Sequence, residues 1–467
     1  MPHRPQARSW LVAALATLLY ALTGARDVLW GEPTKLALLL HDFNLNLAQW
    51  THAGSLLLVW PFTHLPLGSF AHRVHLASAV MSGVALGLLH ATLLRVGATA
   101  RGALCGVTAV ALAHTIWLVS AMAENYAPVL LLLSLAAWLA LARGALWASG
   151  VVLGFGAVAH PICTFGLPAF GLAVLRERRG RGLLQLCAGL ALGWAAPTLF
   201  LSRGDPIGEA GWGAVLERYT SASLVLKNTA VLGALFLYNF AGPALLLLWV
   251  GLRRLQPAQR LLLLLFALAH YAVALIWIPQ RAVFIPTPVY LAAGWPIALG
   301  AEAVLASGRV PARVLFALLV AVPPAVYAAA SVAGRPVVHR FVRDVAYRDE
   351  SATFFAPWGA AAGPARRYVE DVGAAAERDA LLVGDFTLLT PLQYAQEVEG
   401  WRPDVQLFSV DHRTAEEVGA AVDRALGEER PVLLLEGDLP GAEAALARGS
   451  LAPVPGAERL QRLVPAR

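Results

Sequence analysis

Acidic, basic and histidine side chains are concentrated just after the first apolar stretch of the chain. Arg26-Asp27 is followed by Trp30-Gly31-Glu32-Pro33-Thr34-Lys35, then by His41-Asp42 and His52-Ala53-Gly54. A carboxylate at a membrane surface can take a proton from an attacking hydroxyl when a neighbouring cation or metal sets its pKa. Glu32 is the first candidate for such a base, with Asp27 and Asp42 as alternatives. The other interpretation is that these charges only cap interfacial helices and stay hydrated.

Three further polar groups stand at the ends of apolar runs. Glu124 and Tyr126 belong to Ala123-Glu124-Asn125-Tyr126-Ala127, His160-Pro161 interrupts the run 144–175, and Arg281 is the sole charge between 261 and 301. An ionisable group at membrane depth is costly unless paired, which indicates a functional site. The other interpretation is that His160 only bonds to a helix carbonyl and has a structural role. Arg281 could hold a lipid phosphate bidentately, or could simply extend to the membrane surface as an anchor.

The composition indicates that these residues belong to a membrane protein. Hydrophobic residues make up 58% of the chain and charged residues 14%, with a mean hydropathy of +0.61, which excludes a water-soluble globule. Residues 1–334 contain 30 of the 66 charged residues and carry a net charge of +12, whereas 335–467 contain 36 and carry −6. The chain therefore divides near Gly334 into a membrane part and a soluble tail. These opposite charges argue against nucleic acid as a partner.

Charge-free runs predict eleven membrane-spanning helices, because a hydrocarbon core of about 30 Å needs about 20 apolar residues. The runs are 9–25, 74–94, 102–123, 125–142, 144–175, 182–202, 228–252, 261–280, 282–301 and 314–334. His160-Pro161 divides the run 144–175 into two short helices that meet at one face. The run 43–72 is also free of charge, but its three histidines and two prolines favour a position on the membrane surface.

The distribution of basic residues predicts the orientation. With the N-terminus inside, fourteen arginines lie in the loops on that side and seven basic residues lie opposite, the tail excluded, as the positive-inside rule requires. Seven of the nine acids of the membrane part then face outward, as does the tail. We expect an integral protein of a bacterial inner or plasma membrane, with a cytoplasmic N-terminus and an extracytoplasmic C-terminal domain.

The tail has the alternating pattern of an α/β domain. Short buried strands are expected at 380–384, 404–410 and 431–436, with helices near 388–398, 414–426 and 441–448 between and after them. This order predicts a small parallel-type sheet. Asp385 would follow the first strand at its carboxyl end, where open α/β sheets place ligands. The other interpretation is that Asp385 caps the next helix.

Several segments together resemble the GT-C-type membrane glycosyltransferases, in the protein O-mannosyltransferase-like group described as a domain of unknown function. The matches are 123–127, His160-Pro161 and, most specifically, the run Gln393-Tyr394-Ala395-Gln396-Glu397-Val398-Glu399-Gly400-Trp401-Arg402-Pro403-Asp404-Val405. Where the family has Asp-Ser-Gly-Glu, this chain has Glu32-Pro33-Thr34-Lys35, and the family's His-Pro-Pro-Gly corresponds at most to His52-Ala53-Gly54.

The resemblance implies an α-helical polytopic domain of GT-C type at 1–334, with about 11 transmembrane helices and an outer loop at 24–72 that carries the site. An extracytoplasmic α/β domain would follow at 335–467. The implied reaction passes a sugar from a polyprenyl-phosphate donor in the membrane to a hydroxyl of a protein, lipid or glycan acceptor.

In that reaction Glu32 would be the base, with Asp27 and Asp42 as alternatives. The residues expected to bind substrate are His52, Glu124, Tyr126, His160, Arg281 and Asp385. They neither require nor exclude a divalent cation, and no metal ligands are assigned. The alternative is a degenerate relative that binds a lipid-linked glycan or a partner without turnover, which the replacement of the second acid by Lys35 supports.

Overall fold

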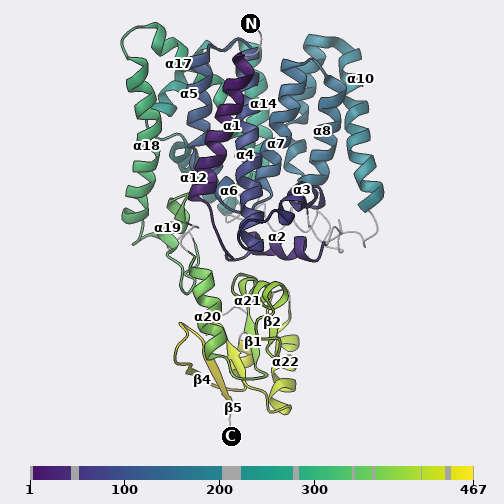
Figure 1. Cartoon of the computed structure of the whole chain (residues 1–467), viewed down its shortest axis with the longest axis vertical. Helices are drawn as coiled ribbons and strands as arrows, with labels where there is room; N and C mark the ends of the chain where they lie inside the picture. The colour runs from purple at the N-terminus through teal and green to yellow at the C-terminus, as the bar shows by residue number, and fades with distance from the viewer. Residues whose placement is uncertain are drawn as a thin grey trace.

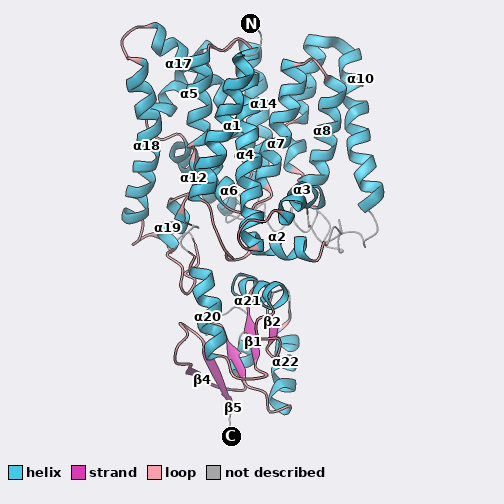
Figure 2. Ribbon diagram, in the orientation of Figure 1, coloured by secondary structure: helices cyan, strands magenta, loops and turns pink. Residues whose placement is uncertain are grey.

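A computed structural model describes residues 4–43, 52–201, 222–276, 283–338, 342–359, 363–411, 413–436 and 443–465. A large helical domain is joined end to end with a smaller α/β tail (Figures 1 and 2). The N-terminus lies at the end of the molecule opposite the tail. The segment that follows α1 (Arg4–Thr23), with α2 (Glu32–His41), lies at the end that faces the tail.

The helical domain contains a series of apolar helices that run roughly along the long axis (Figure 1). Their bounds are α1 (Arg4–Thr23), α4 (Phe70–Arg95), α5 (Ala100–Ala111), α6 (His114–Ala121), α7 (Tyr126–Ala137) with η3 (Trp138–Ala142), α8 (Leu146–Ala159), α9 (Ile162–Phe165), α10 (Leu167–Leu201), α12 (Ala222–Asn239), α13 (Pro243–Arg254), α14 (Pro257–Leu275), α16 (Thr287–Ala292), α17 (Gly294–Ala306) and α18 (Ala312–Ala333).

Helix length and composition identify the membrane spans among the described residues. Five helices are long and apolar enough to cross a membrane, or seven if each of two bent helix pairs is one span, and four shorter apolar helices accompany them. The four shorter helices do not reach the length of a span, so the eleven spans expected from charge-free runs stay a prediction. Helix α8 ends at Ala159, so the expected division of the run 144–175 at His160-Pro161 is present.

Two charge-free runs that were each predicted as one continuous span correspond to bent pairs of helices. The predicted span 102–123 consists of α5 and α6 at 65°, and the predicted span 228–252 falls on α12 and α13 at 100°. The second bend precedes Pro243, which has no N–H to donate and therefore begins a new helix rather than continuing one. Charge-free length does not distinguish a straight span from a bent one.

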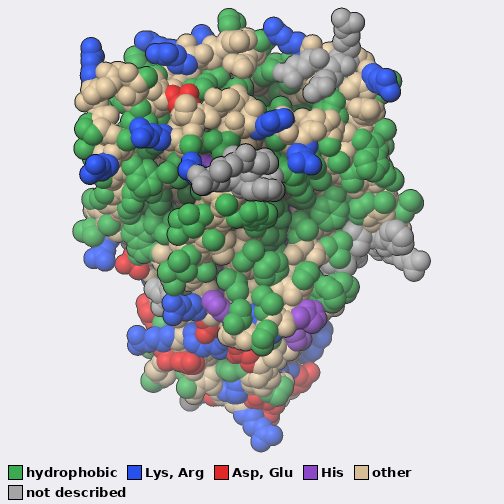
Figure 3. Space-filling model, turned by 45° about the horizontal axis from the view of Figure 1, so that its top comes forward, with side chains coloured by type: hydrophobic (Ala, Val, Ile, Leu, Met, Phe, Trp, Pro, Cys, Tyr) green, Lys and Arg blue, Asp and Glu red, His purple; other side chains and the backbone are tan. Residues whose placement is uncertain are grey.

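Large apolar side chains cover the outside of the helices. Trp10, Leu15, Leu184, Leu226 and Leu264 are all more than half exposed, which is costly in water and expected in contact with lipid. Figure 3 shows a wide band of hydrophobic side chains between a face rich in Lys and Arg and the mixed charges of the tail. The domain is therefore built to lie within a membrane.

The described residues of the segment 43–72 lie near the tail end of the membrane domain (Figure 1). They form α3 (Ala53–Val59) and the 3₁₀-helix η2 (Trp60–His64) before α4 begins at Phe70. Both are far shorter than the roughly 20 residues that a span requires. Neither helix is a membrane span by itself, and the position of the segment at the membrane surface stays a prediction.

The tail consists of a sheet with helices packed on it. Its elements are α19 (Glu350–Phe355), α20 (Pro364–Ala375), β1 (Leu381–Gly384), α21 (Phe386–Glu399), β2 (Gln406–Ser409), α22 (Ala415–Gly427), β3 (Val432–Leu434), α23 (Glu443–Leu446), β4 (Gly449–Pro453) and β5 (Gln461–Pro465). The strand order is β2-β1-β3-β5-β4.

The three expected strands pair in parallel, with Leu381 opposite both Gln406 and Val432. The prediction of a parallel-type sheet was wrong for the last two strands, because β5 runs antiparallel to β3 and to β4. These two strands gave no clear signal, since each is short, mixes polar with apolar residues and ends in proline. The sheet is therefore mixed.

The first outer segment and the tail share one hydrophobic core. A single cluster of buried side chains includes Leu36 and Leu38 of α2, Val74 of α4, and Leu382 and Leu388 of the tail. Burying each such side chain contributes about 1.5–3 kcal/mol. The tail is therefore packed against the membrane domain, and not merely tethered to it by the linker after α18.

Candidate functional site

Helix α2 begins at the candidate base because of the residues on either side of it. Gly31 has φ of 68° and ψ of −130°, a backbone conformation that is nearly restricted to glycine. Pro33 lies in the first turn, where its missing N–H has no helical partner to lose. The half-buried Glu32 is therefore fixed in the first turn. The helix dipole favours its negative charge there.

Helix α21 of the tail holds the start of α2. The N–H of Gly31 donates to Oγ1 of Thr390 at 2.9 Å, so the residue before Glu32 is bonded directly to the tail. Nζ of Lys35 lies 5.5 Å from the centroid of the Phe386 ring, a cation–π contact worth about 0.5–1 kcal/mol at an exposed site. Lys35, which stands where the family has a second acid, thus contributes to docking.

Two further contacts join the tail to the same region. The ring of Trp30 lies 4.7 Å from that of Tyr368. The N–H of Ala71, in the first turn of α4, donates to the hydroxyl of Tyr394 at 3.0 Å. Tyr394 belongs to the segment 393–405, which carries the most specific family resemblance. The structure therefore gives this tyrosine a docking role.

Asp27 forms the charged part of the same interface. Nε and Nη2 of Arg366 donate to its two carboxylate oxygens at 2.9 and 2.6 Å, and Nη1 of Arg366 donates to Glu399 at 2.6 Å. Burial by itself would raise the pKa of Asp27, but hydrogen bonds from Arg366 and from the N–H of Val28, together with the guanidinium charge, hold it below its usual value. A carboxylate held in this way is a weak base.

His75 connects Asp27 to the segment that contains Glu124. It is buried on α4; its Nδ1 accepts the N–H of Ala123 at 2.8 Å, and its Nε2 lies 3.0 Å from the carbonyl oxygen of Asp27. Because one nitrogen faces a donor and the other an acceptor, the ring is the neutral tautomer with its proton on Nε2. His75 thereby sets the distance between the two acidic segments.

The structure brings His52, Tyr126 and His160 together, although they come from three separate segments. The rings of His52 and His160 are stacked, with centroids 4.4 Å apart and planes 8° apart. The ring of Tyr126 lies 5.2 Å from that of His160. The start of α7 and the end of α8 therefore meet next to His52, which precedes α3.

Close packing of α3 against the end of α8 fixes this cluster. A side chain at Gly54 would bring its Cβ within 2.7 Å of the Ala159 nitrogen, and Oγ of Ser55 donates to the Ala159 carbonyl at 2.9 Å. His52 has φ of 51°, a left-handed conformation that costs a non-glycine residue about 1–2 kcal/mol. A strained residue held by its surroundings is typical of functional sites.

Next to Tyr126 is a buried polar atom that the protein does not satisfy. Asn125 is 8% exposed, and its side-chain oxygen makes no hydrogen bond within the described part of the chain. A buried acceptor of this kind costs about 1–3 kcal/mol when it stays unpaired. The half-buried Glu124 precedes it in sequence. A hydroxyl-bearing ligand beside these residues would satisfy Asn125.

Two of the expected site residues, Asp42 and Asp385, lie elsewhere. Asp42 follows α2 at its far end, with its side chain 58% exposed and 3.2 Å from Nδ1 of His41. Asp385 caps α21 by accepting the N–H of Leu388 at 3.0 Å, and it also pairs with Arg343. Its helix-capping interpretation is therefore confirmed. Arg281 lies outside the described residues.

The described residues contain no group of three or more His, Cys, Asp or Glu side chains arranged to hold a metal ion. Asp27 and His75 lie close together, but the Asp27 carboxylate is bonded to Arg366 and both nitrogens of His75 contact backbone groups. No metal role is therefore assigned to these residues.

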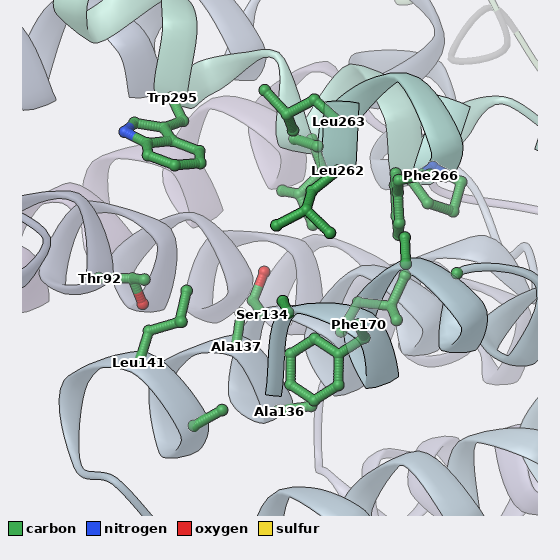
Figure 4. Close-up of a pocket in the computed structure, with 18 of the residues that line it drawn as sticks. Thr92, Ser134, Ala136, Ala137, Leu141, Phe170, Leu262, Leu263, Phe266 and Trp295 are labelled. Carbon is green, nitrogen blue, oxygen red and sulfur yellow. The ribbon is translucent and has the colours of Figure 1, made fainter. Parts of the chain in front are cut away.

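An apolar pocket of about 510 Å³ lies inside the membrane domain (Figure 4). It is lined by α4, α7, α10, α14 and α17, with side chains such as Leu141, Phe170 and Phe266 directed into it. Cys163 lines it as well, and its N–H donates to the carbonyl of His160 at 3.0 Å. Cys163 therefore connects the pocket to the histidine cluster, although His52, Tyr126 and His160 do not themselves line it. Its volume is within the roughly 300–1,000 Å³ typical of ligand pockets.

The whole arrangement is similar to a solved structure, the crystal structure of ArnT from Cupriavidus metallidurans in the apo state. The TM-score is 0.56, the sequence identity is 14%, and the similarity covers 98% of each chain. The chain has the fold of ArnT. No family model matches the sequence, and no curated protein sequence matches it significantly.

The likeness to ArnT includes the tail as well as the membrane helices, since it covers 98% of both chains. The expected fold class, an α-helical polytopic membrane domain of GT-C type followed by a small α/β domain, is thereby confirmed. At 14% identity the likeness to ArnT establishes the fold alone, so the activity needs support from the site itself.

Sequence patterns did not indicate several of the residues that build this site. His75 lies in a charge-free run, where nothing distinguishes it from a core histidine. Arg366 is one of several charged residues on the amphipathic helix α20, and Thr390 lies inside α21. Of the docking residues in the tail, Tyr394 and Glu399 carried a signal, because they belong to the segment 393–405 that resembles the GT-C-type enzymes.

Replacing Tyr394 by phenylalanine is expected to weaken docking of the tail without opening a cavity. The change leaves the buried N–H of Ala71 without an acceptor, which costs about 1–3 kcal/mol. Thermal unfolding of the purified protein in detergent would measure this as a lower midpoint. Tyr347→Phe is the control, because its hydroxyl accepts the N–H of Glu458 within the tail itself. An unchanged midpoint for Tyr394→Phe would contradict the docking role.

Proposed function

We propose that this chain is a membrane glycosyltransferase that takes a sugar from a polyprenyl-phosphate donor and passes it to an acceptor hydroxyl. The observation that carries this proposal is the apolar pocket within the membrane domain, whose lining residue Cys163 bonds to His160 of the cluster of His52, His160 and Tyr126. A donor with a long apolar chain and a polar head needs such an arrangement. The fold shared with ArnT and the resemblance to GT-C enzymes also support it.

The residues divide into three roles. Glu32 takes the proton from the acceptor hydroxyl, whose oxygen then bonds to the anomeric carbon of the sugar while the bond from that carbon to the phosphate oxygen breaks. His52, His160, Tyr126 and Glu124 orient the sugar. Polyprenyl phosphate leaves with its negative charge, and Arg281 is the proposed partner of that phosphate.

Asp27 is better suited to positioning than to catalysis. Its carboxylate is already bonded to Arg366, and its lowered pKa reduces its affinity for a proton. Together with His75 it fixes the segment from which α2 begins. We place this site on the extracytoplasmic side of a bacterial inner membrane, because the Arg-rich face lies at the opposite end of the molecule (Figure 3).

The direct test uses purified full-length protein with radiolabelled polyprenyl-phosphate sugars and a panel of hydroxyl-bearing acceptors. Transfer of label from the lipid to an acceptor, with stoichiometric release of polyprenyl phosphate, is the expected result. Binding of the donor with no transfer to any protein, lipid or glycan acceptor would contradict the proposal. That result would instead indicate a lipid-glycan binding protein.

Filling the pocket is expected to weaken binding of the donor's polyprenyl chain without affecting binding of its polar head. Ser134 is 3% exposed, and its hydroxyl points into the pocket (Figure 4), so Ser134→Trp would occupy the space of the polyprenyl chain. We expect KM for a long-chain donor to rise about tenfold or more, because apolar contact contributes about 0.8 kcal/mol per buried CH₂. The rate with a short-chain donor should not change.

Ser134→Ala is the matched control for this variant, since it removes the hydroxyl without filling the pocket. Its KM for both donors should stay close to that of the wild type. An equal loss of activity with long and short donors in Ser134→Trp would point to misfolding or to a pocket that binds something else.

A further inference from the structure

The loop that leads into α2 is closed by hydrogen bonds of its own. Oγ1 of Thr34 donates to the carbonyl of Leu29, and it accepts the N–H of Leu29 at 3.0 Å. The N–H of Thr34 donates to the carbonyl of Gly31 at 3.1 Å. Because these bonds tie the loop to the first turn of α2, whatever holds Gly31 also sets the direction of that turn. Glu32 is the first residue of the helix.

The N–H of Gly31 is held by the tail. It donates to Oγ1 of Thr390 at 2.9 Å, and both residues are buried. A buried N–H that loses its acceptor is costly, so the backbone gains by moving to find another. Glycine has access to many backbone conformations. The start of α2 can therefore shift when this one bond is lost.

The sequence of α21 orients the hydroxyl of Thr390. Pro391 lies inside this helix and has no N–H, so the carbonyl of Thr387, four residues earlier, loses its helical donor. Oγ1 of Thr390 donates to that carbonyl at 3.4 Å. With its hydrogen directed to Thr387, the hydroxyl offers its oxygen to Gly31 as an acceptor. The hydroxyl is thus prepared for this contact by the tail itself.

A second side chain of α21 packs on the same loop. A Cβ added to Gly31 would lie 3.5 Å from Cε1 of Phe386, and Nζ of Lys35 lies 5.5 Å from the centroid of that ring. Gly31 directly precedes Glu32, and Lys35 follows it by about one helical turn. Phe386 and Thr390 therefore hold the candidate base from both sides in the sequence.

We propose that Thr390 is a positioning residue for sugar transfer: through Gly31 it aligns Glu32 with the acceptor hydroxyl, so that the catalytic site is complete only with the tail docked. A misplacement of 1 Å at a reacting group can cost about 10²-fold in rate, so a small shift of the first turn of α2 is sufficient. A contact that served docking alone would affect stability and not turnover. This inference rests on the proposed function, in which Glu32 is the base.

Thr390→Val tests the proposal, because valine keeps the shape of the side chain and removes its hydroxyl. With the labelled polyprenyl-phosphate donor and a responsive acceptor, we expect kcat of the purified full-length protein to fall about tenfold or more. KM for the donor should stay close to that of the wild type. Thr390→Ser keeps the hydroxyl and should retain kcat. An unchanged kcat in Thr390→Val would overturn the proposal.

Tyr394→Phe is the matched control. It lies on the same helix and removes a different hydrogen bond between the tail and the membrane domain, the one from the N–H of Ala71. It should lower the unfolding midpoint and leave kcat close to that of the wild type. An equal fall of kcat in Thr390→Val and Tyr394→Phe would show that docking in general is what matters, and would overturn the specific role of Thr390.

A double variant tests whether Thr390 acts through Glu32. In the background of Glu32→Gln, the change Thr390→Val should cause little further loss of kcat, because residues that act as one unit are not additive. A further loss as large as the one in the wild-type background would overturn the proposal.

Hydrogen exchange in lipid nanodiscs tests the contact without any donor. The amide of Gly31 should exchange faster in Thr390→Val than in the wild type or Thr390→Ser, and equal rates would overturn the proposal. No sugar transfer by the wild type from any donor would reject the proposed function and the positioning role together. Transfer by the wild type with an unchanged kcat in Thr390→Val would reject the positioning role alone.

Discussion

Replacing Glu32 by glutamine is expected to lower the rate of sugar transfer by about 10²- to 10⁴-fold, the usual contribution of a general base. Glutamine keeps the size and the hydrogen-bonding oxygen of the side chain but cannot accept a proton at neutral pH. Because binding of the donor does not require the proton transfer, KM for the polyprenyl-phosphate sugar should change little. Initial rates with the labelled donor and a responsive acceptor measure both quantities.

The structure distinguishes Glu32 from the other two acids named as candidates. Asp27 is bonded through both oxygens to Arg366, and Asp42 is exposed beyond the other end of α2. A helix of ten residues is about 15 Å long, so Asp42 and Glu32 cannot both reach one reacting hydroxyl. Asp42→Asn is accordingly the control, with an expected rate within twofold of the wild type.

Unchanged transfer by Glu32→Gln would remove this residue from the role of base. A loss of equal size in Asp42→Asn would show that the loop is sensitive to charge in general, and that Glu32 has no special part. Circular dichroism and thermal unfolding of each variant would establish that the fold survives the change.

Removing Arg366 is expected to have the second largest effect, because it leaves two carboxylates facing each other at the interface with the tail. Arg366→Ala breaks the charge-assisted bonds to Asp27 and Glu399. Charge-assisted bonds contribute about 1.5–3 kcal/mol each, and partial exposure of these side chains lowers that figure. We expect about 2 kcal/mol less stability, measured by chemical unfolding in detergent, together with faster proteolysis between α18 and β1.

The neighbouring residue provides a matched control. Arg367 lies on the same helix, but its side chain is 79% exposed and its recorded ion pair, with Asp371, has a separation of 3.6 Å. Such pairs contribute about 0.3–0.5 kcal/mol. Arg367→Ala should therefore unfold and resist proteolysis as the wild type does. If the two variants behaved alike, the ion pair with Asp27 would not be what holds the tail in place.

The same ion pair predicts how docking depends on pH. Because the pKa of Asp27 is lower in the folded protein than its ordinary value of about 3.9, its contribution to stability is fully present above that ordinary value. The contribution is lost as pH falls through the lower, folded value. Docking should not vary with the charge of Asp27 between about pH 5 and 8. Asp27→Asn should lose part of the acid sensitivity below about pH 4, as followed by unfolding midpoints.

The sequence by itself determined the parts of this protein that depend on local composition. The length of the charge-free runs indicated which segments form apolar helices suited to a membrane, because the thickness of the hydrocarbon core sets the number of apolar residues required. His160-Pro161 ended a helix, because a proline cannot continue the hydrogen-bond pattern of the helix before it. Strands β1, β2 and β3 were marked by short apolar runs between helical stretches. The segment 393–405 carried the resemblance to GT-C-type enzymes through its residues alone.

Tertiary structure decided which of these residues meet. The stack of His52 on His160 joins positions 108 apart in the chain, and the pair of Asp27 with Arg366 joins positions 339 apart. His75 links the segment of Asp27 to the segment of Glu124 because α4 is packed between them. Such contacts depend on how helices pack and on a core shared with the tail, and neither leaves a periodic pattern in the sequence. The local sequence determines where helices and strands form. The partners of each polar group depend on how helices and strands that are distant in the chain pack together.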